Sequence, residues 1–167
     1  MKINHYDNHF NANEWFVIIS IVVGILVVLM LPKRFPKKTS AIYLLCGVFI
    51  GFFFDHTLSV LPVSFYDLND SSRVELTDFL SHVMYGPYSY IFFYLYDRFK
   101  IKPRFSLVYI LAWAFISAGL EKLFSHFGVF HYRHGYNLYF SFIIYLFVQS
   151  MWVAFYYVIE TYGERKF

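Results

Sequence analysis

The sequence predicts an all-α integral membrane protein. We expect a single domain over residues 1–167, built as a bundle of five transmembrane helices, with the N-terminus outside and the C-terminus in the cytoplasm. Three observations support this prediction: the chain is 59% hydrophobic and only 15% charged, it contains five apolar runs, and its lysines and arginines cluster between alternate runs. The composition excludes intrinsic disorder, and a single cysteine, Cys46, excludes a disulfide scaffold.

The first two predicted helices are separated by a short basic segment. Because the hydrocarbon core of a bilayer is about 30 Å thick, a spanning helix needs roughly 20 mainly apolar residues. The first run, residues 15–31, ends at Pro32, and lysines and arginine follow it. A secretory signal carries its positive charge before the apolar core, so we expect this helix to be retained. The second run, residues 40–61, is apolar as far as Phe54 and ends at Pro62.

The remaining three predicted helices lie in the second half of the chain. The acidic segment 63–78 predicts a loop with room for a short surface helix. The helix that follows it, residues 79–96, is the weakest of the five, because serines, a histidine and a glycine dilute it and Pro87 indicates a kink or a helix start. The fourth helix covers residues 105–127 and the fifth covers residues 138–159.

The charge distribution predicts the orientation. Ten of the 14 lysines and arginines fall in the loop after the first helix, in the loop after the third helix, or near the C-terminus. Short loops that are rich in these residues stay in the cytoplasm, so the N-terminus and the segment 63–78 are predicted to lie outside. A four-span alternative without the third helix would place the C-terminus outside and split the basic loops between the two faces. The charge pattern therefore favours five spans.

Ionisable residues inside the predicted helices are the first candidates for a functional site, because charges at membrane depth are costly and usually face a bundle interior or water. Helix rise counted from the cytoplasmic ends places Asp55 and Glu121 at a common depth in the outer third of the bilayer. The third helix runs the opposite way, which places Asp78 at the outer boundary and His82 one turn deeper. The predicted intramembrane polar or ligand site contains Asp55, His56, Asp78, His82, Glu121, Lys122 and His126.

A divalent metal is one hypothesis for this outer layer, and no other cofactor is predicted. Under the five-span arrangement the histidines fall outside or in the outer half, and histidine binds metals and titrates near neutral pH. The pairs Asp78/His82 and Lys122/His126 each share a helix face, because their members are four residues apart. The candidate metal ligands are His82, His126, His131 and His134. The structural alternative is an ion pair between Asp55 and Lys122 that fixes the helix register.

Other residues in the predicted helices indicate helix packing. Gly47 and Gly51 are four residues apart and fit the small-residue face at which two membrane helices approach closely. Gln149 in the fifth helix is suited to a hydrogen bond with a neighbouring helix. The tyrosines between residues 85 and 96 fit packing or the membrane interface, where amphipathic rings settle.

Three short segments carry a resemblance to a known family. Phe53-Phe54-Asp55 places an aspartate late in a helix, residues 94–100 form a basic turn after an aromatic helix, and residues 121–130 run from a glutamate to a glycine-aliphatic-aromatic step. In this order, over residues 40–160, the features resemble a family of small multi-spanning membrane proteins of unknown function, known mainly from spore-forming Gram-positive bacteria. The resemblance implies that Asp55 and Glu121 are the two candidate functional positions, and it implies no activity.

The function that the sequence favours is a non-enzymatic one. The chain has no Walker loop, no G-x-G-x-x-G, no G-x-S-x-G and no H-E-x-x-H. We therefore expect a small multi-pass protein of the plasma membrane, in a bacterium the cytoplasmic membrane, that acts as a binding, assembly or carrier subunit with a polar site in the outer third of the bilayer. Its expected partners are the lipid bilayer and either a second copy or a membrane-protein complex, and a nucleic-acid partner has no support.

Two other functions stay open. The first is a membrane-embedded, metal-dependent enzyme that acts at the outer leaflet, with Glu121 or Asp55 as general acid or base. The second is proton-coupled transport, for which the chain lacks the inverted repeat that is typical of transporters.

Overall fold

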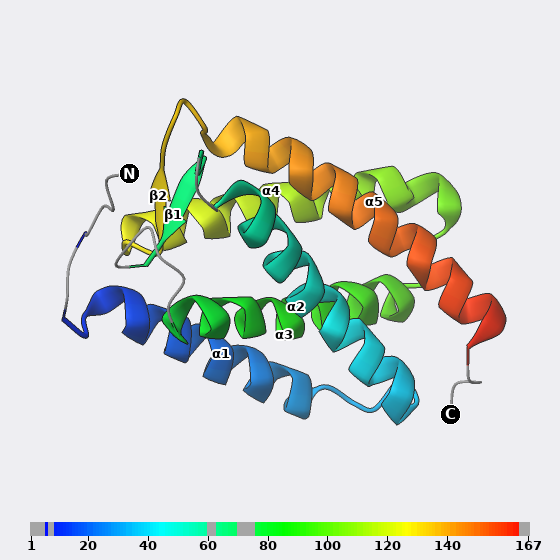
Figure 1. The fold of residues 1–167 in the computed structure, drawn as a ribbon. Helices are drawn as coiled ribbons and strands as arrows, with labels where there is room; N and C mark the ends of the chain where they lie inside the picture. Colours follow the sequence, from blue (N-terminus) through cyan, green and yellow to red (C-terminus); the bar gives the residue numbers. More distant parts are fainter. Residues whose placement is uncertain (1–5, 7–8, 60–62, 70–75, 164–167) are drawn as a thin grey trace.

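The computed structural model describes residues 6, 9–59, 63–69 and 76–163, and it is mostly helical (Figure 1). Its five α-helices are α1 (Ala12–Met30), α2 (Lys37–Leu58), α3 (Leu76–Arg98), α4 (Ser106–His126) and α5 (Leu138–Tyr162). A 3-10 turn, Pro103–Phe105, precedes α4, and two short strands, β1 (Tyr66–Leu68) and β2 (Phe130–Tyr132), form an antiparallel pair. The all-α prediction is confirmed, and the strand pair is an addition to it.

Local sequence explains where several helices begin. The side chain of Asn11 accepts a hydrogen bond from the first turn of α1, and Glu14 Oε2 accepts one from the backbone N–H of Asn11 at 2.7 Å, which is a capping box. α2 begins directly after Pro36, whose fixed φ suits a helix start. Asn137 caps α5 by accepting a hydrogen bond from the backbone N–H of Tyr139 at 3.0 Å.

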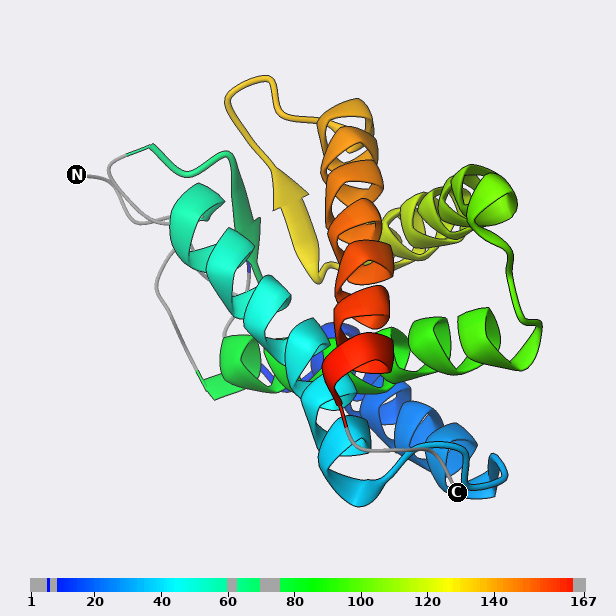
Figure 2. The ribbon, with the colours of Figure 1, turned by 90° about the vertical axis from the view of Figure 1, so that its right-hand side faces the viewer.

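Consecutive helices run in alternating directions along the same long dimension of the molecule (Figure 1). The N-terminus and the β1–β2 pair lie at one end, and the C-terminus lies at the other. α3 packs against α1, α2 and α5, and α4 packs against α5. In both ribbon views α4 lies in the upper half and α1 and α3 lie in the lower half, whereas α2 and α5 slant from one half to the other (Figure 2). α3 is therefore the central helix.

Among the described residues, four helices are long and apolar enough to cross a membrane: α1, α2, α4 together with its preceding 3-10 turn, and α5. These four support a membrane helix bundle. The third predicted span forms a helix of full length, but α3 is less apolar than the others because it carries Ser81, His82 and Ser89. All three side chains are buried. The polar residues of α3 therefore contact neighbouring parts of the protein, whereas the other helices carry apolar side chains on their outer surfaces.

The close approach of α2 and α3 depends on two glycines. A Cβ atom at Gly47 would lie 2.0 Å from the carbonyl oxygen of Tyr85 and 2.5 Å from Ser89 Oγ. A Cβ atom at Gly51 would lie 2.3 Å from the ring of Tyr85. Ser89 Oγ also donates a hydrogen bond to the backbone oxygen of Tyr43 at 2.6 Å, which ties the two helices together. The small-residue packing face that the sequence predicts is therefore present.

The half of the bundle nearer the C-terminus has an aromatic core. Tyr43 stacks on Phe93 with their ring centroids 3.9 Å apart, and both rings are buried. At the end of this core, the buried carboxylate of Asp97 accepts a hydrogen bond from the Tyr156 hydroxyl at 2.5 Å and forms an ion pair with Arg34. This ion pair joins the loop between α1 and α2 to the last turn of α3.

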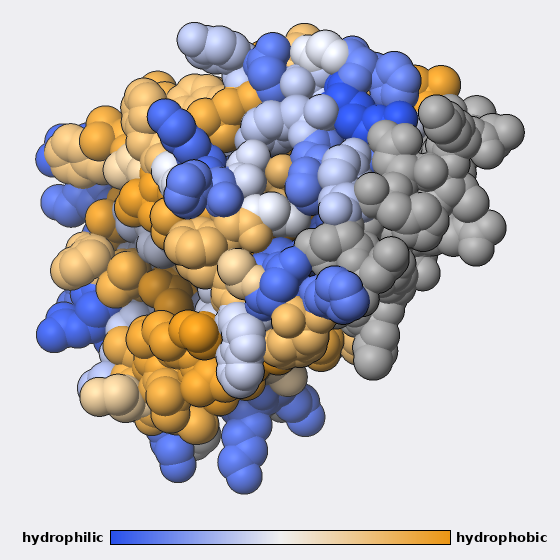
Figure 3. Space-filling view, turned by 90° about the vertical axis from the view of Figure 1, so that its left-hand side faces the viewer, coloured by the Kyte–Doolittle hydropathy of each residue, from blue (hydrophilic) through white to orange (hydrophobic). Residues whose placement is uncertain are grey.

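The opposite end of the bundle carries the β1–β2 pair and a second core. Figure 3 looks onto this end and shows hydrophilic side chains gathered in its upper half, with hydrophobic side chains at the left and below. Beneath this surface, a second hydrophobic cluster joins α1, α3 and α4 to the strands. Its buried members are Val17, Tyr66, Leu68, Met84, Phe124, Val129 and Phe130.

Candidate functional site

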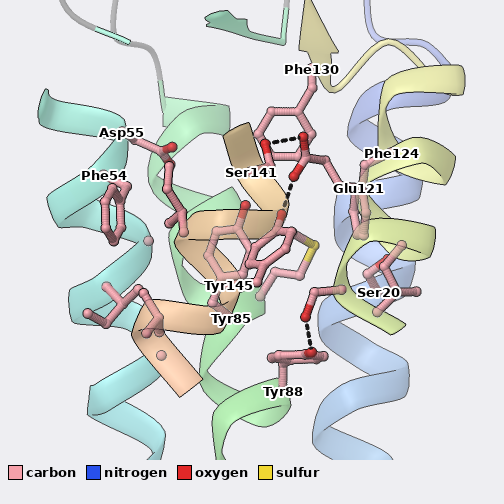
Figure 4. A pocket seen from close by; sticks show the side chains of 18 of the residues that line it. Ser20, Phe54, Asp55, Tyr85, Tyr88, Glu121, Phe124, Phe130, Ser141 and Tyr145 are labelled. Carbon is pink, nitrogen blue, oxygen red and sulfur yellow. Dashed lines mark hydrogen bonds between the residues drawn. The ribbon is translucent and has the colours of Figure 1, made fainter. Parts of the chain in front are cut away.

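A cavity of about 370 Å³ lies inside the bundle. All five helices and both strands contribute side chains to its lining. Most of the wall is apolar, with Val23, Ile50, Met84, Leu120 and Ile144 as examples from the five successive helices. The cavity therefore offers an apolar chamber at the meeting point of the helices, into which two carboxylates project (Figure 4).

Glu121 on α4 is the first of these carboxylates, and only 5% of its surface is exposed. Its Oε1 atom accepts hydrogen bonds from the Tyr132 hydroxyl and from Ser141 Oγ, each at 2.6 Å. Its Oε2 atom accepts a hydrogen bond from the Tyr145 hydroxyl (Figure 4). Three neutral hydroxyl donors thus surround this carboxylate, and within the described part of the chain no cationic side chain forms an ion pair with it.

Asp55 on α2 is the second carboxylate and is 6% exposed. Its Oδ1 atom accepts a hydrogen bond from the Tyr66 hydroxyl at 2.5 Å. Its Oδ2 atom lies 2.9 Å from His82 Nε2, which is ion-pair distance, although the two groups do not have the alignment of a hydrogen bond. Asp55 and Glu121 lie on opposite sides of the cavity in Figure 4, with the rings of Tyr85 and Tyr145 between them.

The β1–β2 pair connects the two carboxylates. Tyr66 and Tyr132 are directly opposite each other in the strand register, so their side chains point to the same face of the ladder. One hydroxyl donates to Asp55 and the other donates to Glu121. The strand pair therefore closes the cavity and fixes a hydrogen-bond donor on each carboxylate.

The environment of these two strand tyrosines favours their protonated form. Burial raises the pKa of the Tyr66 and Tyr132 hydroxyls well above the ordinary value, and the carboxylates that accept their hydrogen bonds raise it further. Both phenols consequently remain donors at any pH near neutrality. An ionised phenol next to a carboxylate would bring two negative charges together in a buried site.

We expect the folded protein to lose stability as the pH rises above about 10, the pKa of an exposed tyrosine. Above that pH the unfolded chain releases phenol protons that the folded chain retains, so folding binds protons and becomes less favourable as the pH increases. Thermal unfolding between about pH 8 and pH 11 measures this effect. The double variant Y66F/Y132F should lose less stability over that range than the wild type. An equal loss in both proteins would show that these two tyrosines are not the source of the pH dependence.

The far end of the cavity holds neutral polar groups. The hydroxyls of Tyr88 and Ser117 lie 2.5 Å apart, and Gln149 Nε2 donates to Ser117 Oγ at 2.8 Å. Gln149 Oε1 and Trp152 Nε1 are buried, and neither atom has a hydrogen-bond partner among the described residues. Both side chains line the cavity. These two atoms each expose less than 1 Å² of surface, so it is other atoms of the two side chains that form the cavity wall.

Not every residue of the predicted polar layer belongs to this site. The side chains of His56, Lys122 and His126 are exposed, so Lys122 lies away from the interior and the ion partner of Asp55 is His82. The His56 ring stacks on its own helix, with its centroid 3.9 Å from that of Phe52.

Asp78 is buried but supports the loop that leads out of β1. It accepts a hydrogen bond from Asn69 Nδ2 at 2.7 Å. Asn69 adopts a left-handed backbone conformation with φ +49°, which asparagine tolerates better than most residues. The contact between Asp78 and Asn69 therefore stabilises the left-handed turn that follows β1.

Strands β1 and β2 with the residues beside them, 63–69 and 129–137, form a cap over one end of the cavity, and the other two predicted metal ligands, His131 and His134, belong to this cap. The His131 ring stacks on Tyr6 with centroids 3.7 Å apart, and His134 Nδ1 lies 2.6 Å from the backbone oxygen of Ser64. Between them, Arg133 pairs with the buried carboxylate of Asp67 at 2.8 Å. Over the part of the chain that the structure describes, no three histidine, cysteine or acidic side chains gather as a metal site would require.

Four residues that contact the carboxylates were not predicted from the sequence: Tyr66, Tyr132, Ser141 and Tyr145. The spacing along the helices holds a signal for two of them. Ser141, Tyr145 and Gln149 are each four residues apart, so they share one face of α5, and all three line the cavity. The strand tyrosines had no such signal, because three-residue strands that pair across more than 60 positions leave no periodic pattern.

This arrangement suits the binding of a small molecule. An apolar chamber with a few convergent polar groups is the common form of a small-molecule site, and the carboxylates, phenols and serine hydroxyls here would orient the polar end of a guest.

Comparisons of the chain with protein-family models, with curated proteins and with solved structures find no match.

Proposed function

We propose that this chain is a multi-pass membrane protein that binds an amphiphilic small molecule in its interhelical cavity, without catalysing a reaction. The observation that carries the proposal is the cavity itself: apolar walls from five helices, with buried carboxylates at one end. A carboxylate at membrane depth is costly without a counter-charge, and Glu121 has none among the described residues, so it marks where the polar part of a guest would lie. The apolar walls would enclose the rest of it.

We propose further that all five helices cross the plasma membrane, with the N-terminus and the β1–β2 pair outside. Two observations support this orientation. The helices alternate in direction and the termini lie at opposite ends (Figure 1). The end away from the strands carries exposed basic residues, among them Lys33, Lys37, Lys100 and Arg104, and short loops of this kind stay in the cytoplasm. Arg165 and Lys166, which also entered the charge argument, lie outside the described residues.

The metal-dependent enzyme is the weaker hypothesis. It relied on His82 and His126 acting together with His131 and His134. His82 is buried beside Asp55, whereas His126 is exposed and the other two contact the cap. Among the described histidines only His82 lies within pairing distance of either carboxylate, and one histidine is fewer than the ligands of known metal sites.

Two neighbouring isoleucines on α5 provide a matched test of the binding proposal. Ile144 lines the cavity, whereas Ile143 is 64% exposed and faces outward. The variant I144W should fill the cavity and exclude a guest, and I143W should add the same bulk outside it. Protein extracted from native membranes into lipid nanodiscs is analysed by native mass spectrometry. We expect a bound small molecule in the wild type and in I143W, and its loss in I144W.

The result that would contradict the proposal is the absence of a bound molecule from all three proteins, or equal retention in all three. Melting temperatures measured without added ligand serve as the control for folding. I144W and I143W should both remain folded, because the cavity gives the larger side chain at position 144 space to enter.

A further inference from the structure

We infer that the guest of this cavity is an organic cation, an amphiphilic amine whose N–H group binds Glu121. This inference rests on the proposed function and adds the chemical class of the ligand. It comes from the difference between the two carboxylates. Asp55 has a cationic partner of its own at 2.9 Å, the His82 imidazole when protonated, whereas Glu121 has none among the described residues.

The nearest candidate for a counter-charge to Glu121 in the sequence is unsuitable. Lys122 follows it directly, but successive helical residues point about 100° apart, and the Lys122 side chain is exposed. Arg133, close in sequence to Tyr132, is committed to Asp67 and Ser64. A cationic guest would therefore supply the positive charge that the bundle does not provide to Glu121.

The hydrogen bonds of Glu121 also leave space for one more donor. A carboxylate has about four acceptor positions, two on each oxygen. Tyr132 and Ser141 occupy both positions on Oε1, and Tyr145 occupies one on Oε2. The remaining position on Oε2 suits a single N–H group, which an ammonium supplies and a quaternary amine does not.

The surroundings of Glu121 favour a cation over other polar groups. Four tyrosines from α3, α5, β2 and the loop before α5 line this part of the cavity: Tyr85, Tyr132, Tyr136 and Tyr145. The faces of aromatic rings attract cations, and the attraction is stronger away from water. An anionic guest would meet repulsion from Glu121, whose charge has no cationic partner among the described residues.

The test compares three probes with the same alkyl chain and different head groups: decylamine, decan-1-ol and decanoate. Wild-type protein in nanodiscs of a zwitterionic lipid is titrated with each probe at neutral pH, and the increase in melting temperature gives an apparent affinity. We expect decylamine to bind at least about tenfold more tightly than decan-1-ol, and decanoate to bind most weakly. This comparison needs no variant, so it holds even if substitutions at Glu121 unfold the protein.

Two matched variants assign the preference to Glu121. E121Q removes the charge inside the cavity, and E160Q removes an exposed charge near the end of α5. The preference for decylamine over decan-1-ol should disappear in E121Q and persist in E160Q.

The outcomes separate this inference from the proposed function. Equal binding of decylamine and decan-1-ol, blocked by I144W, would overturn the cation and retain the binding cavity. Preference for decanoate would overturn the cation and indicate an anionic guest. If none of the three probes stabilises the wild type, both the inference and the proposed function are wrong.

Discussion

Replacing Gly47 by leucine is expected to be among the most destabilising substitutions in this protein. Even the Cβ atom at this position would lie 2.0 Å from the carbonyl oxygen of Tyr85, which is backbone and cannot rotate away. α2 would have to move off α3, and with it the Asp55 wall of the cavity. We expect a loss of about 3 kcal/mol in unfolding free energy, at the upper end of what overpacking costs.

Gly119 on α4 is the matched control. A Cβ atom there meets nothing within 4 Å, and the position is exposed. G119L should leave stability unchanged or raise it slightly, because leucine favours a helix more than glycine does, by about 1 kcal/mol. Thermal unfolding of both variants in one detergent measures the difference. Equal melting temperatures for G47L and G119L would contradict the packing of α2 on α3.

The second large effect is expected at the buried pair of His82 and Asp55. The variant H82L leaves the Asp55 carboxylate buried with the Tyr66 hydroxyl as its remaining partner. Removing one member of a buried ion pair typically costs about 3–5 kcal/mol, because the other charge stays without compensation. H56L, which changes the exposed histidine next to Asp55, should cost little.

A double variant distinguishes lost pairing from lost volume. In D55L/H82L both charged groups are replaced by apolar ones, and such replacements are often close to neutral. We expect D55L/H82L to be more stable than H82L alone in the same unfolding assay. If the double variant is less stable than either single variant, the two residues do not act as a pair.

Helix positions were predictable because most of the helices are long apolar runs bounded by prolines or charges. α5, predicted over residues 138–159, covers Leu138–Tyr162, and α4, predicted over 105–127, covers Ser106–His126. α3 was the hardest to predict from hydropathy. Its polar residues indicated a weak span, and the structure shows that they are buried against its neighbours.

The depth of a residue in the bundle was easier to predict than the direction in which its side chain points. The rise per residue placed Asp55 and Glu121 in one layer, and both do line one cavity. The same reasoning placed His56 and Lys122 there, although each is rotated about 100° from its neighbour and faces outward. The four-residue spacing from Gly47 through Gly51 to Asp55 marks the buried face of α2 and would have separated these cases.

The cap could not be predicted in the same way. The partners of the two carboxylates include Tyr66 and Tyr132, which meet through a strand pair formed by distant parts of the chain. Their contribution depends on tertiary packing, since three-residue strands have no stability of their own. The histidines of the cap suggested metal ligation from their spacing, but His131 and His134 contact Tyr6 and Ser64.

The central claim, that the cavity is a ligand site with its polar end at Glu121, is tested most directly by an experimental structure of the protein taken from native membranes without delipidation. We expect density for an elongated molecule inside the cavity, with a polar atom within hydrogen-bond distance of Glu121 Oε2. A cavity that is filled by the protein's own side chains, or a guest whose polar end lies away from both Glu121 and Asp55, would contradict it.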